Sequence, residues 1–275
     1  MKMQAKPFDL LLRYLVWASA VITFGALIFL IGYIVIRGIP HLRPELFSFT
    51  YTADNVSMLP PLITTALMIV LALLIAAPLG IFTAIYLVEY AKKDNKLVKI
   101  VRVTAETLAG IPSIVYGLFG MLFFVVFMGW GYSLLSGGFT LAIMILPLIM
   151  RTTEESLKSV PDNFREGSFG LGAGRLRTVF RIVLPSAAPG ILAGIILATG
   201  RIAGETAALI YTAGTMPRIP DNLFASGRTL SIHMFELSKE GFYINQAYAT
   251  AVVLLILVVG INTLSAFIAK KIVKI

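Results

Sequence analysis

Long apolar runs alternate with short polar and basic segments along the 275 residues of this chain. The first run, Tyr14 to Ile36, has 23 uncharged residues, and about 20 apolar residues suffice for a helix to cross the hydrocarbon core of a bilayer. It is too long for the apolar part of a signal peptide, so we expect a retained span. The other predicted spans are residues 60–89, two spans within 107–150, then 185–213 and 246–269.

Glycine and proline divide these runs further. Pro78 and Gly80 predict a kink in the second span. Residues 129–132 and 137–138 are rich in glycine and predict the turn between the third and fourth spans. The fourth span is expected to end at Arg151, and the polar segment 214–245 has room for a short external helix within 221–237. The pattern as a whole predicts an all-α integral membrane protein with six transmembrane helices.

Composition supports this class. Hydrophobic residues make up 58% of the chain and charged residues only 13%, whereas soluble domains carry about 25% charged residues; the mean hydropathy is +0.89. The chain has no cysteine, which excludes disulfides and thiolate metal sites. The two histidines, His41 and His233, are far apart in sequence, and we expect them to be exposed loop or interface residues rather than metal ligands.

The net charge of +9 predicts membrane orientation and contact with anionic lipid, not nucleic-acid binding, because the basic residues cluster at the ends of apolar runs. Of the 23 lysine and arginine residues, 17 fall in the predicted inner segments and 5 in the outer ones, with Arg201 inside a span. The positive-inside rule therefore predicts cytoplasmic N- and C-termini and a cytoplasmic loop at residues 151–184.

One polar, basic stretch, Glu166 to Pro185, lies between two apolar runs. Pro161 and Asp162 favour a helix start, and the glycines at 170, 172 and 174 favour a turn that ends it, so the stretch predicts two short helices around a glycine turn. Glycine provides positive φ there and a surface without a Cβ that another protein can approach closely.

This stretch resembles the cytoplasmic coupling loop of ABC importer permeases, whose pattern is Glu-Ala-Ala, three residues, Gly, nine residues, Ile-x-Leu-Pro. The residues that match at the family spacing are Glu166, Gly172, Ile182, Leu184 and Pro185. Gly167 and Ser168 replace the two alanines and are both small. The resemblance implies a type I ABC importer permease fold, with these residues docking on an ATPase. An ordinary basic loop between helices is the competing interpretation.

Arg201 is a charge within the fifth predicted span, where an isolated arginine is unfavourable by roughly 2.5–3.5 kcal/mol. Glu205 follows four residues later and is expected on the same helix face. The pair is interpreted either as a self-neutralised structural ion pair or as the lining of a polar pathway, which we favour because a guanidinium fits an oxyanion. Thr206 is a candidate hydroxyl donor, although hydroxyl bonding to the helix backbone is the simpler expectation for it.

Gly110 and Pro112 predict a break in the third span. Broken backbone at membrane depth is tolerated where it is buried in protein or lines a cavity. Ser113, just after the break, is therefore a candidate pathway residue, and a simple packing kink explains the same sequence equally well.

Two segments, Gly110 to Gly120 and Arg201 to Ala207, resemble phosphate-specific ABC permeases, and Gly204 to Leu209 looks more like PstA-type than PstC-type subunits. The resemblance covers most of the chain from about Pro61. It implies translocation of inorganic phosphate, with Arg201 and Glu205 in the pathway. The implied partners are a second, PstC-like permease subunit, two PstB-like cytoplasmic ATPase subunits and an external PstS-like phosphate-binding protein.

The domain organisation follows from these features. Residues 1–60 hold the N-terminal tail, first span and external loop, and residues 61–275 hold the permease domain with its coupling loop at 151–184. No Gly-Lys pair occurs, so there is no phosphate-binding loop of the G-x-x-x-x-G-K-[ST] type, and the chain is expected to be neither an enzyme nor a cofactor carrier. ATP would be bound by the partner ATPases.

Three alternatives stay open. The cargo could be another oxyanion such as sulfate or molybdate, or the chain could be the sibling PstC-type phosphate subunit. A stand-alone ion-coupled transporter would show inverted repeats with paired broken helices, and only one clear break is visible. An intramembrane enzyme would need a catalytic set at depth, which Arg201 and Glu205 do not supply.

Overall fold

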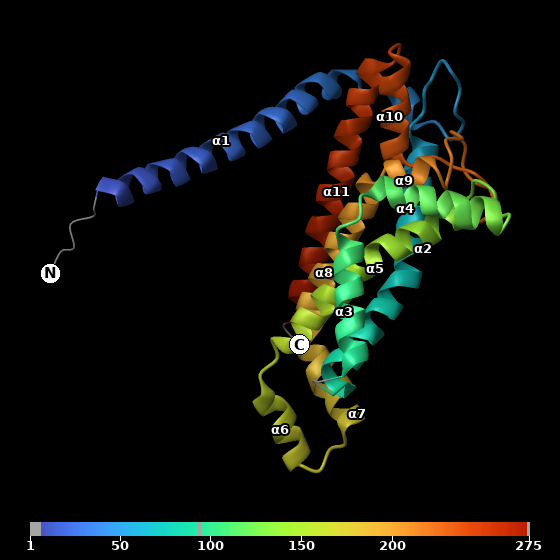
Figure 1. Ribbon diagram of the computed structural model, residues 1–275. Coiled ribbons are helices and arrows are strands. Elements are labelled where there is room, and N and C mark those ends of the chain that lie inside the picture. The colour runs from blue at the N-terminus through green and yellow to red at the C-terminus, as the bar shows by residue number, and fades with distance from the viewer. Residues whose placement is uncertain (1–6, 93–94, 274–275) are drawn as a thin grey trace.

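The computed structural model describes residues 7–92 and 95–273, which form helices and connecting loops, with no strand in these ranges (Figure 1). The helices are α1 (Pro7–Gly38), α2 (Leu59–Ile85), α3 (Lys96–Ala109), α4 (Ser113–Gly120), α5 (Leu134–Lys158), α6 (Asp162–Gly170), α7 (Arg175–Thr178), α8 (Leu184–Gly204), α9 (Ala207–Ile210), α10 (Leu230–Glu240) and α11 (Ile244–Val273). Short π-helical segments, Tyr86–Tyr90, Met121–Phe127 and Val179–Val183, extend α2, α4 and α7.

Five helices are long and apolar enough to cross a membrane, and the count is six when the bent pair α3–α4 is taken as one span. The all-α prediction with six spans agrees with this arrangement. The predicted end of the fourth span at Arg151 is wrong, because α5 continues to Lys158. Its last two turns are polar, and ion pairs four residues apart support them, Arg151 with Glu155 and Glu154 with Lys158.

The long helices α2, α5, α8 and α11 pack side by side as a bundle (Figure 1). Its core is apolar and includes the fully buried Met68, Leu141 and Ile145. Small residues allow close approach of α8 to α5: a Cβ at Gly194 would collide with Thr152.

Glycines at the α4–α5 connection divide into two roles. Gly129 and Gly131 adopt positive φ, 68° and 64°, and form the predicted turn. The prediction that Gly137 and Gly138 belong to that turn is wrong, because both lie inside α5. There they let α2 pack closely, and a Cβ at Gly137 would lie 2.7 Å from the Met68 side chain.

The first helix stands apart from this bundle, pointing away from it along most of its length (Figure 1). No residue in its most apolar 18-residue window is buried. Only its C-terminal end contacts the rest of the chain, at α11, where the rings of Tyr33 and Tyr248 meet edge to face 5.9 Å apart.

The bundle has two distinct ends. A hairpin formed by α6 and α7 projects at one end, and α10 lies at the other (Figure 1). The predicted external helix within 221–237 is α10, which starts later, at Leu230. Of the residues used to predict orientation, Lys2, Lys6, Lys93 and Lys274 lie outside the described residues, and the cytoplasmic position of both termini stays a prediction.

Candidate functional site: a helical hairpin and a charged cavity

The α6–α7 hairpin has the predicted form of two short helices around a glycine turn. Gly172 adopts φ +82°, which satisfies the expectation of positive φ at this position. The adjacent Leu171 is 92% exposed, so an apolar side chain stands at the hairpin tip. An exposed apolar tip on a tightly turned backbone is a surface suited to contact with another protein.

The remaining motif residues divide between the surface and the interior of the hairpin. Glu166 and Gly167 are exposed, whereas Ser168 is buried and its hydroxyl lies 2.8 Å from that of Thr178. Ser168 therefore closes the hairpin instead of facing outward. The last three motif residues lie where the hairpin runs into the membrane helix: Ile182 and Leu184 are half-buried and Pro185 is exposed.

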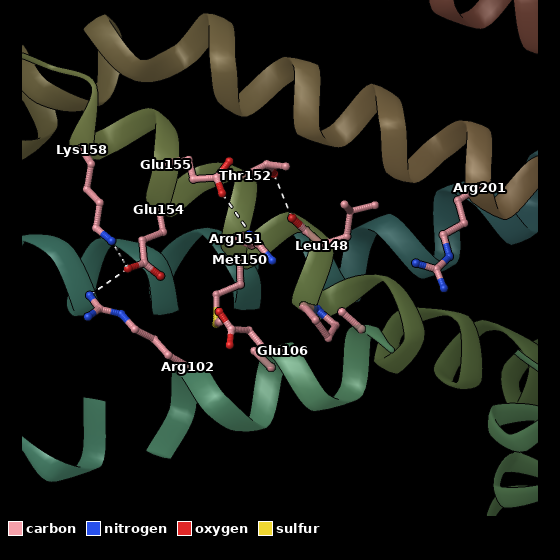
Figure 2. A pocket seen from close by; sticks show the side chains of 13 residues that line it. Arg102, Glu106, Leu148, Met150, Arg151, Thr152, Glu154, Glu155, Lys158 and Arg201 are labelled. Carbon is pink, nitrogen blue, oxygen red and sulfur yellow. Dashed lines mark hydrogen bonds and ion pairs between the residues drawn. The ribbon is translucent and has the colours of Figure 1, made fainter. Parts of the chain in front are cut away.

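A cavity of about 600 Å³ lies between α3, α5 and α8. Its charged lining residues are Arg102, Glu106, Arg151, Glu154, Glu155, Lys158 and Arg201. Figure 2 shows Arg201 at one end of this group and Arg102 and Lys158 at the other. Arg201 also borders a more apolar hollow against α11.

Ion pairs organise the cavity walls. One carboxylate oxygen of Glu154 forms ion pairs with Arg102 at 2.8 Å and with Lys158 at 2.6 Å, and the first of these ties α3 to α5. Arg151 pairs with Glu155 at 3.1 Å (Figure 2). Within the described ranges, Arg201 belongs to no ion pair. Its half-buried guanidinium is thus the cavity cation whose charge is not already matched by a carboxylate.

Glu205 does not lie on the helix face of Arg201, so this prediction is wrong. The helix α8 ends at Gly204, and Glu205 has an extended backbone with φ −73° and ψ 126°. Its side chain accepts from the Ala208 N–H at 3.1 Å, and its carbonyl accepts from the Ser231 hydroxyl at 2.7 Å. Glu205 therefore caps α9 and contacts α10.

The predicted break at Gly110 and Pro112 is present and much larger than a packing kink. The axes of α3 and α4 differ by 102° across it. The hydroxyl of Tyr116 donates to the Leu108 carbonyl at 2.7 Å and holds the two sides together. Ser113 is the first residue of α4 and does not line the charged cavity.

A second break at Glu205 and Thr206 was not anticipated and divides the fifth predicted span into α8 and α9. Thr206 lies in the break, with its hydroxyl 3.4 Å from the Gly204 carbonyl, and does not line the cavity either. The helices that follow the two breaks, α4 and α9, pack against each other. A Cβ added to Gly117 of α4 would lie 2.8 Å from the Cα of Ala208 in α9.

Comparison with known proteins identifies the family of this chain. The family of binding-protein-dependent transport system inner membrane components matches residues 76–274. The chain belongs to this family. The probable ABC transporter permease protein YqgI of Bacillus subtilis (strain 168) is 35% identical over 257 residues, 87% of this chain and 86% of the relative. The phosphate transport system permease protein PstA of Yersinia pestis is 33% identical over 268 residues, 94% and 89% of the two chains.

Solved structures share the fold of this permease. A chain of a bacterial alginate ABC transporter, in complex with an alginate pentasaccharide-bound periplasmic protein, matches with a TM-score of 0.68 at 15% identity over 98% of both chains. A chain of the MetNI methionine ABC transporter matches with a TM-score of 0.62 at 21% identity, covering 78% of this chain and 93% of that chain. The predicted type I importer permease fold is thereby confirmed, and the permease is a multi-pass protein of the inner membrane.

Sequence reasoning missed most of the cavity of the permease. Arg102, Arg151 and Lys158 were interpreted only as orientation signals at the ends of apolar runs. The available signal was the spacing of Arg151 with Glu155 and of Glu154 with Lys158, four residues apart directly after an apolar run. Such spacing predicts continued helix with charges on adjoining faces.

The expectation that His233 is an exposed loop or interface residue is wrong, because His233 is fully buried in α10. Its ring meets that of Tyr51 edge to face at 6.1 Å, and the Arg228 guanidinium lies 4.7 Å from the centroid of the same Tyr51 ring. Burial, and secondarily the Arg228 charge, lowers the pKa of His233 to about 3. No group of three or more metal-ligating side chains occurs in the searched, described part of the permease, and His233 is a neutral core residue.

Proposed function

We propose that this permease is the membrane-spanning subunit of an ATP-driven importer that carries inorganic phosphate into the cytoplasm. The observation that carries the proposal is the half-buried Arg201 of α8 at the wall of a cavity that also holds Arg102, Arg151 and Lys158. A guanidinium presents N–H groups in a planar fork that matches the oxygens of an oxyanion. The relative from Yersinia pestis, which is named for phosphate transport, supports this cargo.

A continuous helix connects the hairpin to the residue proposed to contact the cargo. The span that begins with α7 runs continuously through the π-helical segment into α8, over residues Arg175–Gly204. A displacement of the hairpin therefore moves the helix that carries Arg201. ATPase subunits docked on the exposed Leu171 and Gly172 would bind and hydrolyse the ATP, and this chain would hold no cofactor of its own.

Partner subunits would complete the assembly. The exposed apolar surface of α1 supports contact with a second, homologous PstC-like permease subunit, because it has no cover within this chain. Two PstB-like ATPases would occupy the hairpin end of the bundle. A PstS-like phosphate-binding protein would deliver cargo at the α10 end, and lipid would cover the remaining apolar surface.

Replacing Arg201 tests the role of the guanidinium. We expect Arg201→Met to lower phosphate uptake in proteoliposomes by about tenfold or more, since a charge-assisted hydrogen bond contributes about 1.5–3 kcal/mol. The variant should still copurify with its ATPase. Arg218→Met, which removes an exposed arginine outside the cavity, should transport at close to the wild-type rate. Wild-type uptake by Arg201→Met would remove Arg201 from the mechanism.

The cargo is decided by the anion that stimulates ATP hydrolysis in the copurified complex. Phosphate should stimulate hydrolysis in the presence of its binding protein, and sulfate and molybdate should not. Stimulation by sulfate or molybdate alone would assign the same pathway to another oxyanion.

The paired breaks at residues 110–112 and 205–206 are the observation that favours the competing function, a stand-alone ion-coupled transporter. Liposomes that contain only this chain separate the two mechanisms. Under our proposal, these liposomes take up no phosphate when an ion gradient is applied. Uptake begins only when the ATPase and the second permease are present and ATP is supplied.

A further inference from the structure

Arg165 of α6 makes the most extensive side-chain contacts of any arginine in the described residues. Its Nε donates to both Glu89 carboxylate oxygens at 3.2 and 3.3 Å, and its Nη2 donates to the nearer one at 2.6 Å. Nη2 also donates to the Leu157 carbonyl at 2.9 Å, and Nη1 donates to the Val160 carbonyl at 2.7 Å and to Asp162 at 3.2 Å. All five N–H groups of the guanidinium are therefore engaged.

These contacts join three separate elements at the hairpin end of the bundle. Glu89 lies in the π-helical segment that ends α2, and Leu157 lies in the last turn of α5, with Val160 just beyond. Arginine near a helix C-terminus satisfies carbonyl groups that have no partner within the helix. Arg165 thus fastens the hairpin helix α6 to the ends of both α2 and α5.

The environment of the contact distinguishes it from a surface ion pair. The side chains of Arg165 and Glu89 are only 15% and 8% exposed, whereas Asp162 is 87% exposed. The hydrogen bond from Arg165 to Glu89 is the largest cause of a raised pKa for the guanidinium. Lysine offers one ammonium group and cannot reproduce a planar fork that reaches a carboxylate and two carbonyls together.

Among its backbone connections to the membrane region, the hairpin has one that is continuous helix. The helix α7 runs without interruption into α8. The other helix of the hairpin, α6, joins α5 only through the non-helical residues 159–161. A push on the hairpin would reach α8 directly. It would reach α5 through the packing of α8 on α5, and by a second route, through α6, only if that short link were braced.

We propose that Arg165 is a positioning residue that braces this link, so that the hairpin drives α2 and α5 together with α8. The inference rests on the proposed function of the hairpin as the ATPase contact. Since Arg151 and Glu154 belong to α5 and Arg201 to α8, the brace makes both walls of the charged cavity respond to one displacement. Without it, ATP hydrolysis would displace α8 directly and α5 only through its packing on α8, so the two walls would move less closely together.

The first test measures phosphate transported per ATP hydrolysed in the reconstituted complex. Arg165→Lys and Arg165→Gln should lower this ratio about fivefold or more, while binding of the ATPase and its hydrolysis rate stay within about twofold of wild type. Glu89→Gln should lower it in the same direction. Asp162→Asn, which changes only the exposed partner, should leave it unchanged. A wild-type ratio in Arg165→Lys would overturn the proposal.

The second test restores the brace by chemistry. The chain has no cysteine, so Glu89→Cys with Arg165→Cys introduces the only two thiols. This double variant should transport with a low ratio until a short bifunctional thiol reagent links α6 to α2, after which the ratio should rise. Linked and unlinked samples are the same folded variant and differ only in the link between α6 and α2. A linked complex that still transports little phosphate per ATP would therefore contradict the brace.

A third measurement is independent of the cargo. Spin labels on the exposed Phe164 of α6 and on Tyr86 at the end of α2 report the distance between these elements with and without ATP. The distance should stay constant in wild type and change with nucleotide in Arg165→Gln. A large change in wild type refutes the brace, whereas a constant distance in a complex that moves no phosphate refutes the proposed cargo alone.

Discussion

At the scale of single residues, His233 is the group whose titration should be visible in stability. The folded protein holds the pKa of His233 at about 3, mainly through burial, and an unfolded histidine titrates near 6.5. Below pH 6.5 the unfolded chain therefore binds a proton that the folded chain does not. The free energy of unfolding should fall as the pH drops from 6.5 towards 3, by up to about 1.4 kcal/mol per pH unit.

Thermal unfolding of the purified permease between pH 7.5 and 5 measures this loss. His233→Leu should flatten the part of the profile below pH 6.5, and His41→Leu, which changes the other histidine, should leave it as in wild type. Parallel profiles for wild type and His233→Leu would show that His233 binds its proton equally well in the folded state.

Residues also show what sequence alone could and could not supply. Arg201 was recognised because a lone charge in an apolar run has a high cost. The burial of His233 was not, because its neighbours Tyr51 and Arg228 come from distant segments and only the fold brings them together. Glu205 was misplaced because a four-residue spacing implies a shared face only while the helix continues, and α8 stops at Gly204.

At the scale of elements, the hairpin turn offers a matched pair of substitutions. Gly172 and Gly170 both have open space around an added Cβ, and only Gly172 has positive φ. Gly172→Ala should therefore strain the turn by about 1–2 kcal/mol, whereas Gly170→Ala should be tolerated or slightly stabilising. Transport per ATP should fall in Gly172→Ala and further in Gly172→Trp, which adds bulk at the tip. Unchanged, substrate-stimulated hydrolysis in Gly172→Trp would count against docking at this turn.

Element types were predictable and element ends were not. The apolar runs predicted α1, α2, α5, α8 and α11 but not most of α3, which forms from the basic segment that starts at Lys96. Pro112 predicted the first break, since proline disfavours helix in the residue before it. The 102° angle at that break depends on tertiary contacts, Tyr116 with Leu108 and Gly117 with α9, that no local pattern encodes. The polar end of α5 does not follow from hydrophobicity, which is lost at Arg151 while the helix continues to Lys158.

At the scale of the whole molecule, contacts within this chain do not account for the position of α1, because its apolar surface is not buried against other helices. The bundle buries its core, yet the large apolar side chains of α1 between residues 21 and 28 are each more than half exposed, including Phe24 and Ile28. In a bilayer such a helix contacts either lipid all round or another subunit along one face. We expect the second arrangement, with α1 packed on the partner permease.

Single cysteines placed in turn at residues 21–28 distinguish these arrangements, because the native chain contributes no thiol. If one face of α1 packs on the partner, crosslinking to that subunit should peak at positions three or four residues apart and vanish when the partner is not coexpressed. Lipid contact all round predicts no peak at any position. Crosslinks only between copies of this chain would instead show that α1 serves self-association, and the proposed pairing with a different permease would then be wrong.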